Sequence, residues 1–493
     1  MSHDRARQQS ERQLDSVRAK TQRGAAGRRG RRRRLIRAVA CLSGWFLLPA
    51  GCDRDPDARR AVLQAPPAGH FADPTALSCW KEPGSWPQFM HDPLHTGRAD
   101  VDFPRERLQP AWEFRPSEHV YSYREGMSVW SSPVAGTVQG RPLVIAGYCD
   151  RNVYAVDAVT GGKVWEFSPG GHVFAAPALA DLPGGPLVIL AATNRTVFGV
   201  DAATGQRRWT FQTADWTFTQ APSFMSSPTV VALDGVPTVF VGVWISDRSA
   251  TRNVQSGELA AIRADDGSPI WRKRLASVPV TSPVVARMGT VPVVFVATHH
   301  GVVDAVSAAN GELLWESPLN EGLRSSVSMG LAGGTWSLFV GTRQHTLFAL
   351  DPTTGARRWR APANYWLDAT PGLVFGNDVN VVVAGSYDRN VYAWSAGDGK
   401  PVWTTLTGNY AYSSPAIASM KGRLSVFQMS WDQGLYVLDG ASGRVIWKTF
   451  SGPLMWSHAF QGDSLWASPA VTRVGGKPLV LFPACDGRLY AFF

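Results

Sequence analysis

From residue 108 to the C-terminus, short runs of alternating apolar and polar residues recur at a nearly constant spacing. One unit starts at Pro133, continues through an apolar run, a polar turn and the alternating VYAVD of residues 153–157, and ends in TGGKVWEF. Alternation with a period of two in β-branched and aromatic residues predicts β-strands, and the intervening Gly, Asp and Thr predict turns. Each unit is expected to form four short antiparallel strands, A to D.

Seven segments place a glycine four residues before a tryptophan, and most neighbouring tryptophans are 44 residues apart. An eighth tryptophan, in AWEF, has the strand D pattern without strands A to C before it, and the chain ends after a strand C. Residues 108–115 are therefore predicted to complete the last unit. We expect an all-β fold, an eight-bladed β-propeller of four-stranded antiparallel blades whose last blade is closed by an N-terminal strand. An open solenoid is the alternative, which the matching defects at the two ends disfavour.

The repeated tryptophans are expected to pack blade against blade, because one lies at the same depth in strand D of each blade. They are Trp112, Trp165, Trp209, Trp271, Trp315, Trp359, Trp403 and Trp447. The aspartates of the C-to-D turns are expected to accept hydrogen bonds from nearby backbone amides, as Asx turns do. These are Asp157, Asp201, Asp351 and Asp439.

Strand direction places the D-to-A and B-to-C connections on one face of the ring, called here the long-loop face. The D-to-A connections before Pro133, Pro228 and Pro469 are longer than the others, and the third blade carries an 11-residue B-to-C insertion, WISDRSATRNV. Loops on a rigid scaffold commonly carry binding sites. Aromatic residues near these connections are predicted to bind a ligand or partner, with packing between loops as the alternative: Tyr123, Trp130, Trp216, Phe218, Trp244, Tyr365, Trp366, Tyr387, Tyr410, Tyr412, Trp431 and Trp456.

The net charge of the chain is located entirely at its N-terminus. The 493 residues carry a net charge of +10, and residues 1–37 hold 13 basic and 3 acidic residues, so the remainder is neutral. A neutral body gives no indication of nucleic-acid binding. Residues 38–51 are uncharged, which predicts a signal peptide over residues 1–51, although the route of export stays open.

The predicted signal peptide ends in Ala50-Gly51-Cys52, which is similar to a bacterial lipobox. Cys52 is therefore the expected lipidation site, and an ordinary secretory leader is the alternative. Residues 52–84 are rich in Pro, Ala and charge without a sustained period, so they are predicted to form a flexible linker. The chain is expected in the periplasm or cell envelope, anchored to a membrane and monomeric.

The segment AVDAVTGGKVW of residues 155–165 and its copies resemble the tryptophan-docking motif of quinoprotein dehydrogenases, which bind pyrroloquinoline quinone (PQQ). The segment WPQFMHDPLHTGR of residues 86–98 is similar to the entry segment of PQQ-like propeller proteins. The resemblance covers residues 85–493 and implies a PQQ-like propeller there. That class includes alcohol and glucose dehydrogenases. It also includes non-enzymatic members, such as the propeller lipoprotein of the outer-membrane barrel-assembly machinery.

The ligand set that the resemblance implies for the enzymes has no evident match in the chain. They stack a disulfide between adjacent cysteines on the quinone and hold calcium with Glu, Asn and Asp oxygens, whereas this chain has no adjacent cysteines. Asp388 and Asp432 lie on the long-loop face, but turn roles explain them equally well. PQQ with calcium therefore remains only a possible cofactor, and no catalytic residue or metal site is assigned.

These observations favour a non-catalytic extracytoplasmic binding or scaffold propeller that engages a protein partner or small ligand through its long-loop face. A PQQ-dependent oxidoreductase of alcohols or sugars and a saccharide-binding surface module are the alternatives. Cys149 and Cys485 each precede the turn aspartate of neighbouring blades. A disulfide between them could staple the ring in an oxidising compartment.

Overall fold

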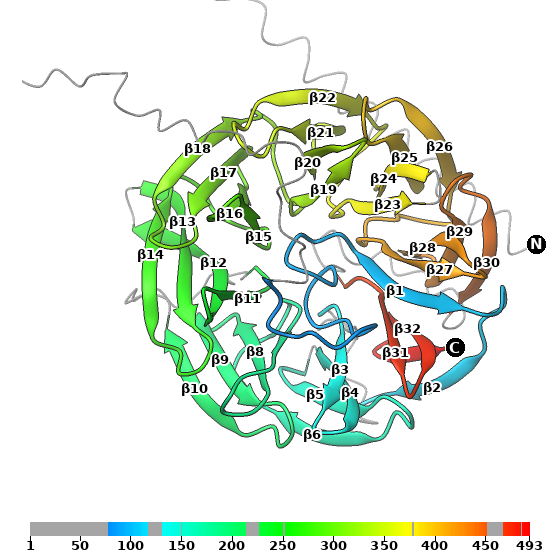
Figure 1. The fold of residues 1–493 in the computed structure, drawn as a ribbon, viewed down its shortest axis with the longest axis horizontal. Helices are drawn as coiled ribbons and strands as arrows, with labels where there is room; N and C mark the ends of the chain where they lie inside the picture. The colour runs from blue at the N-terminus through cyan, green and yellow to red at the C-terminus, as the bar shows by residue number, and fades with distance from the viewer. Residues whose placement is uncertain are drawn as a thin grey trace, which may run out of the picture. The chain divides into compact units, whose positions relative to one another are not determined.

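The computed structural model describes residues 77–116, 131–148, 150–212, 226–249, 252–376, 379–450, 467–484 and 486–493, without the side chains of residues 244–256. In these residues the strands form eight sheets arranged as a ring around a central axis (Figure 1). No helix in this part of the chain combines the length and hydropathy needed to cross a membrane. The expected all-β, eight-bladed propeller is confirmed.

Each blade is built from four strands, A to D, running outward from the axis, and most neighbouring strands follow one another in sequence. Blade one contains β3 (Val134–Val138), β4 (Arg141–Gly147), β5 (Val153–Asp157) and β6 (Lys163–Phe167), and blade two contains β7 (Ala178–Ala180), β8 (Leu187–Ala192), β9 (Thr196–Asp201) and β10 (Arg207–Gln212). Blade three contains β11 (Thr229–Leu233), β12 (Val236–Ser249), β13 (Arg252–Arg263) and β14 (Pro269–Leu275), and blade four contains β15 (Val284–Met288), β16 (Val291–Thr298), β17 (Val302–Ser307) and β18 (Leu313–Pro318).

Blades five to eight repeat this arrangement, and the last outer strand comes from the N-terminal side of the chain. Blade five contains β19 (Ser328–Ala332), β20 (Thr335–Gly341), β21 (Thr346–Leu350) and β22 (Arg357–Pro362), and blade six contains β23 (Gly372–Gly376), β24 (Val379–Gly385), β25 (Asn390–Ser395) and β26 (Pro401–Leu406). Blade seven contains β27 (Ala416–Met420), β28 (Arg423–Ser430), β29 (Gly434–Asp439) and β30 (Val445–Phe450), and blade eight contains β31 (Ala470–Val474), β32 (Lys477–Pro483), β33 (Leu489–Phe492) and β2 (Pro110–Phe114).

The ring is closed by β2, which pairs antiparallel with β33 at the C-terminus. The backbone groups of Gln109 and Phe493 exchange two hydrogen bonds of 2.9 Å, one in each direction. The predicted closing segment, residues 108–115, is therefore confirmed. Closure pairs the outer edge of the last blade, which would otherwise remain open to other strands.

The blade tryptophans dock each blade onto the next. Trp165 Nε1 donates to Ala202 O at 2.9 Å, and its indole lies against Gly205, where a Cβ would come within 2.9 Å of the ring. Gly205 also has a φ of +75°, so both space and backbone require glycine there. Six others bond the next blade in the same way, at 2.8–3.1 Å: Trp112, Trp209, Trp271, Trp315, Trp359 and Trp403. Trp447 packs against Phe492, with ring centroids 5.7 Å apart.

The aspartates of the C-to-D turns accept backbone hydrogen bonds, as predicted. Asp157 Oδ1 accepts from the N–H groups of Val159 and Thr160 at 3.0 and 3.1 Å. The other three make the equivalent pair of contacts: Asp201, Asp351 and Asp439. These bonds fix the turn that presents the docking glycine to the tryptophan of the preceding blade.

A second set of interblade bonds comes from the hydroxyl residue that precedes the proline of most inner strands. In seven places this hydroxyl accepts from the backbone N–H of the equivalent residue in the preceding blade, at 2.9–3.2 Å. The accepting residues form what we call the hydroxyl belt: Ser132, Ser227, Ser282, Ser326, Thr370, Ser414 and Ser468. Blade two has Ala176 at this position.

The N-terminal segment runs once around the inside of the ring (Figure 1). Between Gly84 and Gly97 it accepts one hydrogen bond from the backbone of every inner strand, in the order blade eight, one, two, three, four, five, six and seven. The acceptors are backbone carbonyls except in blade three, where Val230 N donates to Gln88 Oε1 at 3.1 Å. The chain then forms β1 (Arg98–Phe103), which pairs parallel with β27. This strand was not predicted from the sequence.

The ordered contacts of the ring begin earlier than the expected boundary at residue 85. Ser78 forms a bridge with Val231, and Leu77 and Trp80 are buried. Glu82 Oε2 accepts from Thr137 N at 2.6 Å. Residues 77–84, placed in the flexible linker by composition, therefore pack on the propeller because Leu77 and Trp80 bury apolar side chains there.

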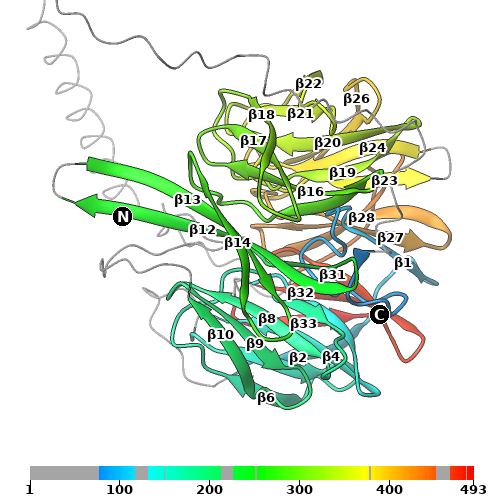
Figure 2. The ribbon, with the colours of Figure 1, turned by 60° about the vertical axis from the view of Figure 1, so that its left-hand side comes forward.

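The insertion in blade three extends a β-ribbon. The B-to-C turns of other blades follow a strand B that ends near Gly147, Gly341 or Gly385, whereas β12 and β13 continue in register for seven pairs beyond Gly242, to Ser249 opposite Arg252. Figure 2 shows this ribbon projecting well clear of the disc. The predicted insertion is thus regular structure.

Candidate functional site

The described aromatic residues predicted on the long-loop face lie in one continuous row. It includes Tyr365 and Trp366 before β23, Tyr387 after β24, Tyr410 and Tyr412 before β27, and Trp431 after β28. Each ring contacts the next at centroid distances of 4.4–5.7 Å. We call this set the aromatic row; it spans blades five to seven.

The end of the aromatic row next to blade five has charged and polar neighbours. His345 stacks on Tyr365 with centroids 5.2 Å apart, and the Arg343 guanidinium lies 4.4 Å from the Trp366 ring centroid. Arg343 also donates to both oxygens of Asp368, at 2.8–3.3 Å. A paired guanidinium over an indole face fixes the ring through ion-pair and cation–π contacts together.

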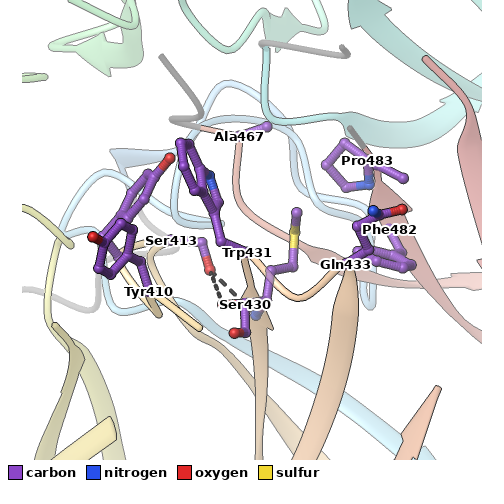
Figure 3. A pocket seen from close by; sticks show the side chains of 11 residues that line it. Tyr410, Ser413, Ser430, Trp431, Gln433, Ala467, Phe482 and Pro483 are labelled. Atoms are coloured by element: carbon purple, nitrogen blue, oxygen red, sulfur yellow. Dashed lines mark hydrogen bonds between the residues drawn. The ribbon is translucent and has the colours of Figure 1, made fainter. Parts of the chain in front are cut away.

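At its blade-seven end the row borders a shallow concavity between blades seven and eight, whose volume of about 380 Å³ includes space open to solvent (Figure 3). Aromatic, aliphatic and small polar side chains line it, and none of them is ionisable apart from the tyrosine hydroxyls. The lining residues are Tyr410, Tyr412, Ser413, Met429, Ser430, Trp431, Gln433, Ala467, Phe482, Pro483 and Ala484. We call this concavity the blade 7–8 pocket.

The serine hydroxyls of the pocket are engaged in the wall itself. Ser413 Oγ accepts from Met429 N at 3.2 Å and from Gln428 Nε2 at 2.8 Å. Ser430 Oγ donates to Asn409 O at 3.0 Å. The Nε1 of Trp431, in contrast, is buried without a hydrogen-bond partner. It is thus a buried donor that the wall leaves unsatisfied.

The carboxylates Asp388 and Asp432 of the long-loop face are used in hydrogen bonds that hold the B-to-C turns. Asp388 and Asp432 accept hydrogen bonds from the hydroxyls of Tyr392 and Tyr436. Each carboxylate also accepts a hydrogen bond from the backbone N–H two residues later in the chain. Burial, and then the hydrogen bond to Asp388, raises the pKa of Tyr392 to about 12. These hydroxyls therefore stay protonated and donate at neutral pH. Blades one and eight repeat the contact, so four consecutive blades share it.

Several predicted residues lie outside what the structure describes. Tyr123, Trp130, Trp216, Phe218 and Trp456 belong to undescribed segments, and the side chain of Trp244 is not described. The same holds for Cys52, Cys149, Cys485 and the predicted signal peptide. Met429, Phe482 and Pro483, which the structure adds to the pocket, carry no signal in the sequence, because they end strands of ordinary core pattern.

The family model described as outer membrane protein assembly factor BamB matches residues 109–297 and 299–491. The chain belongs to this family. No curated protein matches it.

Solved structures similar to this BamB-family propeller include two alcohol-oxidising enzymes. The quinohemoprotein alcohol dehydrogenase of Comamonas testosteroni matches with a TM-score of 0.61 and 13% identity, over 83% of this chain and 80% of that one. A europium-containing methanol dehydrogenase matches with a TM-score of 0.59 and 14% identity, over 84% and 98% of the two chains. At these identities the likeness shows the fold alone.

The described residues of this BamB-family propeller do not fit PQQ with calcium. No group of three or more Asp, Glu, His or Cys in the described ranges is placed to hold a metal ion. The described lining residues of the blade 7–8 pocket include no carboxylate, whereas calcium takes six to eight hard oxygen ligands. The turn carboxylates Asp388, Asp432 and Asp486 on this face each already accept a hydrogen bond from a tyrosine hydroxyl. We therefore derive no chemical step through this cofactor.

Proposed function

We propose that the chain is a non-catalytic binding propeller of the cell envelope that holds a partner polypeptide on the aromatic row. The row itself carries this proposal. Tyr365 and Tyr410 are 42% and 40% exposed and belong to one unbroken series of rings leading into a pocket whose described lining residues carry no charged group. The other rings of the row are intermediate or, for Tyr412, buried, so the row is a contiguous and partly exposed aromatic surface. Surfaces of this kind commonly mark interaction sites.

The lining of the pocket favours a polypeptide over a saccharide or an enzyme substrate. A sugar presents many hydroxyls, and each needs a hydrogen-bond partner when it is buried. Ser413 and Ser430 are already bonded within the wall, and the described lining residues include no carboxylate, histidine or lysine. Aromatic and thioether side chains instead suit apolar side chains of a protein partner.

The proposal places the propeller at a membrane through Cys52. Acylation at this residue would tether the body, and the family description as an outer membrane protein assembly factor supports a place in the envelope. Cys52→Ser is expected to move the full chain from the membrane fraction to the soluble fraction. Continued membrane association of this variant at high salt would contradict the anchor.

Site-specific photo-crosslinking tests the binding role. A benzophenone amino acid replaces Tyr410 in the full chain, and the matched control replaces Val159, which is 63% exposed in a C-to-D turn on the opposite face. We expect cells to give one discrete adduct, with the same partner segment identified by mass spectrometry, from position 410 and not from 159. The proposal is wrong if position 410 gives no adduct, or if both positions give the same one.

A further inference from the structure

Charge is distributed unevenly over the face of the ring that lies opposite the long-loop face. We call it the turn face, because it is formed by the A-to-B and C-to-D turns. We propose that a basic patch on the turn face, at blades seven and eight, binds the anionic headgroups of a phospholipid bilayer, so that the aromatic row points away from the membrane. This inference goes beyond the proposed function, since it concerns a different surface and a different class of partner.

The basic patch lies where blades seven and eight meet the N-terminal side of the chain (Figure 1). β1 runs parallel to β27 and ends beside the A-to-B turn of blade seven, where Lys421 N donates to Phe103 O at 2.8 Å. Residues 104–109 then lead to Gln109, which bonds Phe493 after the end of strand C of blade eight. This connection and the turns beside it therefore share the turn face.

Basic residues outnumber acidic ones in these segments. Residues 98–109, 421–423, 439–444 and 473–477 together carry eight basic and four acidic residues. All eight basic side chains are exposed: Arg98, Arg105, Arg107, Lys421, Arg423, Arg444, Arg473 and Lys477. The corresponding turns of blades two and three have the opposite balance, with one basic and five acidic residues in 181–186, 201–206, 232–236 and 263–268. The positive charge of the turn face is thus concentrated at blades seven and eight.

The cations of the basic patch are largely left without ion-pair partners. Among the eight, in the described part of the chain, only Arg423 forms an ion pair, with Glu106 at 2.6 Å. Arginines near the turns of other blades are paired instead, as in Arg141–Asp157, Arg208–Asp201, Arg287–Asp234 and Arg358–Asp351. Clustered cations of this kind attract an anionic bilayer surface, and each Lys or Arg near the surface adds to the affinity.

Exposed apolar side chains accompany the cations. Phe493, which bonds Gln109, is 43% exposed, and Val445, which follows Arg444, is 38% exposed. Aromatic and aliphatic side chains of this kind enter the headgroup region of a bilayer, while the charged ends of Lys and Arg stay in contact with phosphate. A bilayer accepts both kinds of group, whereas a nucleic-acid backbone would engage only the charges. The composition of the patch therefore favours a lipid surface.

The described chain also joins the ring on the turn face. Asp181 N, in the A-to-B connection of blade two, donates to Cys79 O at 3.1 Å, and Leu77 packs with Leu233 at the end of β11. An anchor before residue 77 is therefore connected to the turn face. The β12–β13 ribbon projects on the other side of the disc from β1 (Figure 2). A bilayer on the basic patch thus leaves the long-loop face free for a partner.

Sedimentation with lipid vesicles tests the inference on residues 77–493. This part contains every described strand of the closed ring, and it lacks residues 1–37, whose 13 basic residues would bind anionic vesicles by themselves. We expect saturable binding to phosphatidylcholine vesicles with about one third phosphatidylglycerol and little binding to pure phosphatidylcholine. Binding should weaken as the salt concentration rises, because salt screens exposed charges.

The triple variant Arg107→Gln, Lys421→Gln and Lys477→Gln removes three exposed charges that have no ion pair among the described residues. Gln139 holds the position of Lys421 in blade one, with a φ of +49° against +50°, so glutamine fits this turn. Affinity for the anionic vesicles should fall about fivefold per charge, and about a hundredfold for all three. The thermal midpoint should stay that of the parent.

The matched control removes three exposed arginines from the long-loop ends of the strands and should bind as the parent does: Arg115→Gln, Arg151→Gln and Arg389→Gln. Equal binding to anionic and neutral vesicles, parental binding by the patch variant, or an equal loss in the control would each overturn the inference. Tighter binding of soluble polyglutamate than of the anionic vesicles would overturn it too, because the patch would then serve an acidic protein. Photo-crosslinking at position 410 concerns the opposite face, so either proposal can fail alone.

Discussion

Removing one acceptor of the hydroxyl belt shows how strongly the belt joins neighbouring blades. In Ser326→Ala the backbone N–H of Ser282 loses its acceptor at 2.9 Å, and the two residues are 5% and 6% exposed. Water has little access to replace the lost partner, and an unsatisfied buried N–H costs about 1–3 kcal/mol. Because only one oxygen is removed, a cavity adds little. We expect the free energy of unfolding to fall by about 1–3 kcal/mol.

The reverse substitution, Ala176→Ser, is the matched counterpart. Ala176 is 2% exposed and stands where the other blades have the belt hydroxyl. A serine there supplies an eighth acceptor, facing the backbone N–H of the equivalent residue in blade one, Ser132. A typical intramolecular hydrogen bond contributes about 0.5–1.5 kcal/mol. The free energy of unfolding is therefore expected to rise by about this amount.

Urea unfolding followed by tryptophan fluorescence measures both changes. A shift of the midpoint with an unchanged slope reports stability rather than a change in the surface exposed. The hydroxyl belt does not stabilise the ring in this way if Ser326→Ala leaves the midpoint unchanged, or if Ala176→Ser lowers it.

Three further outcomes follow from the structure. Burial, and then the Glu316 carboxylate, raises the pKa of Asp304 from 3.8 to about 7. Between pH 3.8 and about 7 the Asp304 carboxyl is protonated in the folded chain and ionised in the unfolded chain, so the free energy of unfolding falls as the pH rises, by up to about 1.4 kcal/mol per pH unit. Asp304→Asn should flatten this dependence, measured as the difference between urea midpoints at pH 4.5 and 7.5. Replacing residues 244–256 by Asn-Gly should leave the thermal midpoint unchanged, because the ribbon pairs there only with itself, and a loss of several degrees would show a contact with the ring. Non-reducing peptide mapping should recover Cys149 and Cys485 in one linked peptide, and two free thiols would end that prediction.

The blade pattern could be predicted from sequence because its determinants are local and repeated. The docking tryptophan, the turn glycine and the turn aspartate lie within ten residues of one another, as in Asp157, Gly161 and Trp165. Each interblade contact then follows from repetition of the same unit. The hydroxyl before the strand A proline was visible too, but its role in the belt depends on the next blade and emerges only from the structure.

The course of the N-terminal segment could not be predicted in the same way. Residues 84–97 have no period, and their partners lie on eight different strands, up to several hundred residues away. Trp86, Met90 and Leu94 are buried, although a Pro- and His-rich sequence reads as a loop. Its backbone bonds add to strands that the repeat already forms, so no sequence pattern marks the positions that accept them.

The candidate site was predictable in part. Strand direction and the aromatic content of the connections brought Tyr365, Trp366, Tyr387, Tyr410 and Trp431 to one face. The unsatisfied Nε1 of Trp431 could not be foreseen, because it depends on which neighbouring acceptors are already used. The walls of the blade 7–8 pocket could not be predicted either, because they come from strand ends of two adjacent blades.

The position of the pocket within the ring explains why binding would occur there. The N-terminal segment occupies the ring centre with buried side chains, so a ligand reaches this part of the molecule from the long-loop face. The four blades that share the aspartate–tyrosine turn contact are blades six, seven, eight and one, and the pocket lies at the middle of this series. These contacts hold the B-to-C turns on both sides of the pocket in fixed conformations. A preformed surface loses little conformational entropy when it binds a partner, which favours binding at this part of the ring.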